Sequence, residues 1–155
     1  RLANYYAFLL NLSTHGGNYV RFRVDESYAA LEAAPCLEAG FLGAGWFEEQ
    51  TAWEVDQVHT KALELGVYIQ QTLYNENANL VSLNQKHPDA GAKNSHSAYL
   101  KPNGGPLDPE DCFQEWWLNP TVLKLVEQKL RYVLARWGYS RNFAMLEIFN
   151  GKLLV

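Results

Sequence analysis

The residues best suited to chemistry lie near the end of the chain, in the strand-like segment 143–151, which reads F-A-M-L-E-I-F-N-G. Side chains alternate between the two faces of a strand, so Glu147, Phe149 and Gly151 share one face. A carboxyl group set among apolar side chains can hold its proton and act as a general acid. Glu147 is therefore the predicted catalytic residue, and a structural ion pair with an arginine of another strand is the alternative.

Two arginines lie on one face of an earlier strand-like segment. The run 18–24 reads N-Y-V-R-F-R-V, and Arg21 and Arg23 are two residues apart. That spacing puts both guanidinium groups on the same side of a strand. Either arginine can form a buried ion pair with Glu147, and Arg21 is also a candidate for a binding site.

Aromatic residues make up 14% of the chain, with 5 Trp and 9 Tyr. His96, Tyr99, Trp116 and Trp117 lie in or near a long polar connection over residues 75–115. Aromatic rings stack on the apolar faces of sugars, and histidine donates hydrogen bonds. These four residues are predicted to bind substrate, and the alternative is that the two tryptophans pack the connection onto the sheet.

Hydrophobic periodicity and turn residues predict the elements that must position these side chains. The second helix has Gly66 as its expected C-terminal stop, and Asn119-Pro120 is a typical helix start. We expect helices over 2–13, around 28–32, over 49–65 and from 120 to 137, and strands over 18–24, 67–73 and 143–150.

Strands that alternate with helices predict an α/β fold with a parallel sheet. The 155 residues form one predicted domain, 1–155, with three confident strands. A (β/α)8 barrel needs eight strands and about 250 residues, so this chain is expected to form a partial TIM barrel. An open sheet exposes its edges and, by this expectation, an apolar inner face, which predicts a homo-oligomer.

Five segments together resemble cellulase-like glycoside hydrolases of clan A, near family 5. The most specific part is the run R-Y-V-L-A-R-W-G-Y-S that leads into L-E-I-F-N. The resemblance covers nearly the whole chain and rests on residues 16–21, 103–106, 119–120, 130–140 and 146–150.

The resemblance implies a barrel piece from the first helix through the fourth strand, with a carbohydrate as the partner. Asn150 would hydrogen-bond a sugar hydroxyl, and Arg21 would brace the catalytic nucleophile; a strand end satisfied by the backbone is the alternative for Asn150. The family's acid/base Glu follows that Asn, where this chain has Gly151. Retaining hydrolysis needs two carboxyl groups roughly 5 Å apart. Weak or altered hydrolysis is therefore expected, and a non-catalytic, self-assembling barrel fragment that binds sugars is the alternative.

Composition argues against several other functions. The net charge is −4 and there is no run of Lys and Arg, so a nucleic acid is not an expected partner. No apolar stretch is long enough to span a membrane. The spacing of the four histidines and of Cys36 and Cys112 does not match a metal site, so neither a metal nor a cofactor is expected. Isolated thiols are the preferred interpretation of the two cysteines, with a disulfide as the alternative; the localisation is left open.

Overall fold

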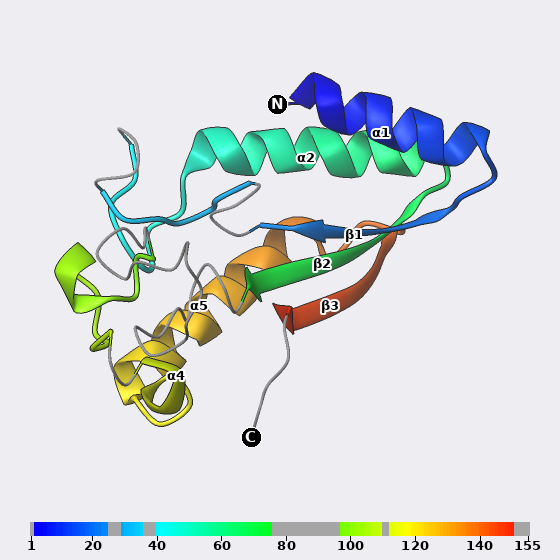
Figure 1. Ribbon diagram of the computed structural model, residues 1–155. Helices are drawn as coiled ribbons and strands as arrows, with labels where there is room; N and C mark the ends of the chain where they lie inside the picture. Colours follow the sequence, from blue (N-terminus) through cyan, green and yellow to red (C-terminus); the bar gives the residue numbers. More distant parts are fainter. Residues whose placement is uncertain (1, 25–28, 36–39, 76–96, 110–111, 151–155) are drawn as a thin grey trace, which may run out of the picture.

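The computed structural model describes residues 2–24, 29–35, 40–75, 97–109 and 112–150, without the side chains of 112 and 113 (Figure 1). Cys36, His96 and Gly151 therefore lie outside the described residues. In chain order the elements are α1 Leu2–Thr14, β1 Tyr19–Arg23, α2 Glu49–Glu64, β2 Tyr68–Asn75, the 3-10 helix Lys101–Asn103, α4 Cys112–Glu115, α5 Pro120–Trp137 and β3 Phe143–Asn150. None of the helices in these ranges combines the length and the apolar character needed to cross a membrane.

The three strands form one parallel sheet in the order β1-β2-β3. Arg21 of β1 is level with Gln70 of β2, and Thr72 of β2 is level with Glu147 of β3. Helices α1 and α2 run side by side along the sheet near β1, and α5 lies behind β2 and β3 (Figure 1). The prediction of an α/β fold with an open parallel sheet, as in part of a TIM barrel, is confirmed.

Local sequence signals fix where the helices begin and end. The side chain of Asn119 accepts hydrogen bonds from the backbone N–H groups of Thr121 (3.0 Å) and Val122 (3.4 Å) at the start of α5. Gly66 follows α2 with a φ of 67°, a left-handed conformation that favours glycine. Both positions were predicted from the sequence.

The hydrophobic core lies between the sheet and the helices. Val55 and Val58 of α2, together with Ile69 and Leu73 of β2, are fully or almost fully buried. The side chain of Leu9 in α1 is 2% exposed and belongs to the same core. Since a parallel sheet is stabilised by helices that cover it, this layer holds the strands in register.

Three expectations from the sequence need correction. The described residues 29–32 form bends and no helix. Residues 98–100 and Leu107, inside the predicted long polar connection, are fully or almost fully buried. The strand face turned away from the helices is mixed, because the aliphatic residues of β1 and β2 turn to the helices while Tyr19, Tyr68 and Met145 stay exposed among charged and amide side chains. The apolar inner face expected from the sequence is therefore only partly present.

A buried histidine links α2 to the sheet. The Nε2 atom of His59 lies 3.0 Å from Oε1 of Gln71, and the ring stacks between Trp137 and Phe143. Burial lowers the pKa of His59 below its ordinary value, and this effect exceeds the opposing ones of the Gln71 hydrogen bond and of Asp56. The folded state thus keeps the neutral ring at a pH where the unfolded chain binds a proton.

We expect His59 to make the protein less stable as the pH falls below about 6.5, the ordinary histidine pKa. The unfolded state then binds more protons than the folded state, so the free energy of unfolding decreases with decreasing pH. Urea unfolding of wild type and His59→Gln between pH 7.5 and pH 5, roughly the range over which histidine titrates, checks this. The slope should be shallower in His59→Gln and unchanged in the surface control His15→Gln. Equal slopes in wild type and His59→Gln would contradict it.

Candidate functional site

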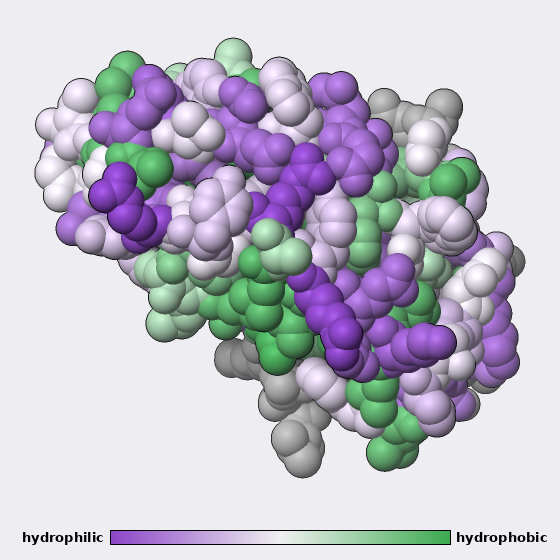
Figure 2. All heavy atoms as spheres, turned by 180° about the vertical axis from the view of Figure 1, so that it is seen from behind, coloured by the Kyte–Doolittle hydropathy of each residue, from purple (hydrophilic) through white to green (hydrophobic). Residues whose placement is uncertain are grey.

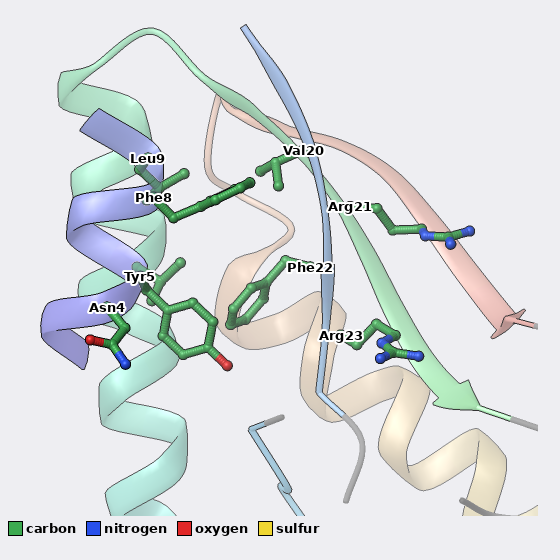
Figure 3. Close-up of a pocket in the computed structure, with 9 residues that line it drawn as sticks. Asn4, Tyr5, Phe8, Leu9, Val20, Arg21, Phe22 and Arg23 are labelled. Carbon is green, nitrogen blue, oxygen red and sulfur yellow. The ribbon is translucent and has the colours of Figure 1, made fainter. Parts of the chain in front are cut away.

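The candidate site is the inner face of the sheet, meaning the strand side chains that point away from α1 and α2. Figure 3 shows Val20 and Phe22 of β1 pointing toward α1, while Arg21 and Arg23 point to the opposite side. On β2, Gln71 contacts His59 of α2, so its neighbours Gln70 and Thr72 belong to the inner face. The inner face comprises Tyr19, Arg21, Arg23, Tyr68, Gln70, Thr72, Tyr74, Met145, Glu147 and Phe149.

Glu147 lies on the end strand β3 and is held by three side chains of this face. Its Oε2 atom accepts hydrogen bonds from Thr72 Oγ1 (2.6 Å) and Gln70 Nε2 (3.0 Å), and its Oε1 atom lies 3.5 Å from Arg21 Nη1. The hydroxyl of Tyr19 donates to the side-chain Oε1 atom of Gln70, which orients the side-chain amide of Gln70. An ion pair between Glu147 and Arg21 is thus present, but it is partly exposed to solvent and not buried as expected. The sequence suggested apolar surroundings for this carboxylate. Its surroundings in the structure are polar.

The inner face can bind and orient a polar ligand, but it does not present two acidic groups. Among the strand residues that the structure describes, Glu147 is the only carboxylate on this face. Glycoside hydrolysis usually requires two carboxyl groups that flank the scissile bond. The side chain of Arg21 is 49% exposed and that of Glu147 is 21% exposed, so solvent and small ligands reach both.

An aromatic cluster covers the carboxyl ends of β2 and β3. The ring of Phe149 stacks on Tyr74 with centroids 5.2 Å apart, and Trp116 contacts both rings edge-on. Trp117 lies 5.4 Å from Phe149, and 42% of its surface stays exposed. Trp117 is therefore the tryptophan in this cluster with a face available for a ligand.

The other predicted site residues occupy different positions. Tyr99 and Trp116 are fully buried, so they pack the connection onto the sheet and present no surface to a sugar. Asn150 ends β3 level with Asn75 and is half-buried, and strand alternation places it on the face of Ile148 and not on the inner face. His96 lies outside the described residues. The structure thus brings Arg21 of β1 and Glu147 of β3 together. Trp117 and Asn150 lie near the carboxyl end of β3.

Sequence reasoning missed a buried ion pair behind the aromatic cluster. Lys129 Nζ lies 3.1 Å from Glu32 Oε1, and both side chains are at most 2% exposed. Glu32 also accepts hydrogen bonds from the hydroxyl of Tyr99 (2.6 Å) and the backbone N–H of Gly45 (2.8 Å). Lys129 occupies an apolar-stripe position of α5, between Val126 and Val133, and a charge at that position is the sequence signal that could have revealed the pair.

This cluster keeps its tyrosines protonated. The hydroxyls of Tyr74 and Tyr99 lie 2.9 Å apart. Burial, reinforced by the negative charge of Glu32, raises the pKa of both tyrosines well above the ordinary value. Neither hydroxyl can therefore act as a base, and the cluster connects the loops beyond β1 and β2 to α5.

The described residues hold no cluster of three or more histidine, cysteine or acidic side chains that could bind a metal ion. This statement covers the described ranges alone, and Cys36 and His96 lie outside them. The chemistry available on the inner face is therefore hydrogen bonding, one carboxylate, one or two guanidinium groups and aromatic stacking.

Comparison with solved structures finds a β-mannanase from the blue mussel Mytilus edulis, with 13% sequence identity and a TM-score of 0.55. The match covers 96% of this chain and 33% of the mussel chain. Neither a protein-family model nor a curated protein sequence matches this chain. At this identity the likeness concerns the fold: the chain folds like about one third of a clan A glycoside hydrolase.

Proposed function

We propose that this protein is glycoside-hydrolase-like, that its inner face binds β-linked sugars, and that any hydrolysis it catalyses is weak. The likeness of almost the whole chain to a β-mannanase carries this proposal. In parallel barrels the ligands bind at the carboxyl ends of the strands, where Trp117 and Asn150 lie.

The chemistry of the inner face supports sugar binding. Sugars bind proteins through planar hydrogen-bonding groups and through aromatic rings that stack on their apolar faces. The inner face offers hydrogen-bond donors and acceptors on its three strands, from Arg21, Gln70 and Glu147. The exposed ring of Trp117 lies near the carboxyl ends of the strands. By strand alternation Asn150 shares the face of Ile148, so its assignment to a sugar hydroxyl applies to a sugar that reaches over the end of β3.

Hydrolysis is expected to be weak because the described inner face has one carboxylate where the resembled family uses two. Gly151 occupies the position at which the resembled family has its acid/base Glu, and Glu147 is the single carboxylate on the described inner face. General acid catalysis typically contributes about 10²–10⁴-fold. We assign to Glu147 the role of a substitute catalytic carboxylate, two residues earlier on the same strand face.

We expect wild type to hydrolyse activated aryl β-mannosides or β-glucosides slowly, and Glu147→Gln to lower the remaining rate by about 10-fold or more, because the amide cannot transfer the proton. Steady-state assays on both substrates check this. Glu127→Gln is the matched control, since Glu127 makes an exposed ion pair with Arg131 on α5. A fast wild type with an unaffected Glu147→Gln would remove Glu147 from the mechanism.

The absence of a second inner-face carboxylate among the described residues favours a second candidate function. In that alternative the protein binds sugars and self-assembles without catalysis. The same assay distinguishes the two, since a purely binding protein gives no turnover in wild type or in Glu147→Gln.

A further inference from the structure

The edge of the sheet at β1 borders an apolar groove with a volume of about 520 Å³. Tyr5, Phe8 and Leu9 of α1 line one wall, and Val20 and Phe22 of β1 line the other (Figure 3). Phe8 is 52% exposed, which is high for a phenylalanine beside a core. Asn4, Arg21 and Arg23 also line the groove, which leaves the apolar surface of Phe8 uncovered beside β1.

The backbone of β1 is ready to accept another strand at this edge. The backbone oxygen of Asn18 accepts from Tyr68 N–H, and Val24 N–H donates to the backbone oxygen of Thr72. The even-numbered residues of β1 therefore direct their backbone N–H and C=O groups toward β2. In a parallel ladder the alternate residues, Tyr19 and Arg21 among them, direct their N–H and C=O groups to the opposite side. An exposed edge of this kind is a template for strand addition.

We propose that β3 of a second copy of this chain docks in the groove between α1 and β1 and continues the sheet head to tail. β3 is the other end strand of the described sheet, and it runs parallel to β1. Placing it beside β1 of another copy keeps all the strands parallel. This interface extends beyond the proposed sugar-binding function and does not depend on it.

Side-chain chemistry favours β3 as the occupant. Ile148 lies on the helix-side face of β3 and is 44% exposed, so it would present an apolar group to Phe8 and Val20 of the groove, while Leu146 on the same face packs against the core of its own copy. Seen from behind, the molecule has an apolar patch near the centre of this face, with hydrophilic atoms above it and to its right (Figure 2). On the inner face, Glu147 of one copy would come beside Arg21 and Arg23 of the next, which gives opposite charges on neighbouring strands.

Pairing of β1 with β1 is disfavoured by the same reasoning. It would bring Arg21 and Arg23 of both copies onto one side of adjacent strands, where like charges destabilise the pairing. Pairing of β3 with β3 would leave the groove uncovered. A head-to-tail contact joins two different surfaces, so it forms a ring where the rotation closes and a longer chain where it does not.

Phe8→Glu places a charge in the groove, and Ile148→Lys places one on the docking strand. We expect wild type to exceed the monomer mass in sedimentation equilibrium at micromolar concentration, and each variant alone to be monomeric. Mixing the two variants should restore association, because each supplies the intact surface that the other lacks. Leu63→Lys, at a 40% exposed position of α2, is the matched control and should associate like wild type.

A monomeric wild type would overturn the proposal, as would a mixture of the two variants that stays monomeric. Loss of association in Phe8→Glu alone, with Ile148→Lys still associating, would indicate β1-to-β1 pairing instead. Hydrogen exchange of wild type needs no substitution: the amide of Arg21 should exchange more slowly as the protein concentration rises. Exchange that is independent of concentration would equally contradict the docking.

Discussion

Replacing Lys129 with methionine should destabilise the fold by about 3–5 kcal/mol, the usual cost of leaving one partner of a buried ion pair alone. Lys129 and Glu32 lie 3.1 Å apart with almost no exposure, and the ammonium group also lies 4.3 Å above the ring of Tyr74. Methionine fills similar space but leaves the charge of Glu32 in the core. Chemical unfolding followed by circular dichroism measures the loss.

The double variant Glu32→Gln/Lys129→Met is the control for this prediction. It removes both charges, and buried ion pairs are often replaced by neutral groups at little cost. We therefore expect the double variant to recover at least half of the stability that Lys129→Met loses. A loss below about 1 kcal/mol in Lys129→Met would show that the pair behaves like an exposed one.

Trp116→Ala is expected to cost about 3–5 kcal/mol, because it empties the centre of the aromatic cluster. The ring of Trp116 is fully buried and contacts Tyr74, Tyr99 and Phe149 at centroid distances of 4.6–5.3 Å. Its Nε1 atom has no hydrogen-bond partner among the described residues, and its printed contacts there are ring packing.

Trp117→Ala is the matched comparison, since Trp117 is the neighbouring residue and is 42% exposed. Its stability loss should stay near 1 kcal/mol or less, as for most exposed positions. Sugar binding should weaken in Trp117→Ala while it persists in any Trp116 variant that folds. A stable Trp116→Ala protein that has lost sugar binding would contradict the assignment of Trp116 to packing and of Trp117 to sugar binding.

The helices and strands were predictable because their signals are local. The apolar stripe of α5, its Asn119-Pro120 start and the alternation of β1 each fall within one short segment. The structure places β1, β2 and β3 close to the predicted ranges. The region 29–32 was mispredicted as a helix because its weak propensity is overridden by Glu32, whose carboxylate bonds to Tyr99 and Gly45 in the core.

The candidate site depended on contacts that the sequence does not specify. Arg21 and Glu147 are 126 residues apart, and both β1 and β3 must pair with β2 before they meet. Sequence alternation identified the shared face of each strand but not which face turned to the helices. The inner face was expected to be apolar for that reason, while Gln70, Thr72 and Glu147 make it partly polar.

The burial of Tyr99 and Trp116 shows the same limit. Their types suit either a sugar cleft or a core, and only the packing of residues 97–107 against β2 decides between the two. Lys129 is the opposite case, since its place in the apolar stripe of α5 was visible in the sequence.

The most direct test of the central claim is an NMR titration of the amide signals with a β-1,4-linked manno-oligosaccharide, with an α-linked gluco-oligosaccharide as the control sugar. The inner face should respond to the β-linked sugar with saturable shifts at Arg21, Gln70, Thr72, Glu147 and the indole of Trp117, and the control sugar should leave these signals in place. Unchanged inner-face signals at millimolar β-linked sugar, or equal shifts with both sugars, would contradict the assignment of this face to β-linked carbohydrate.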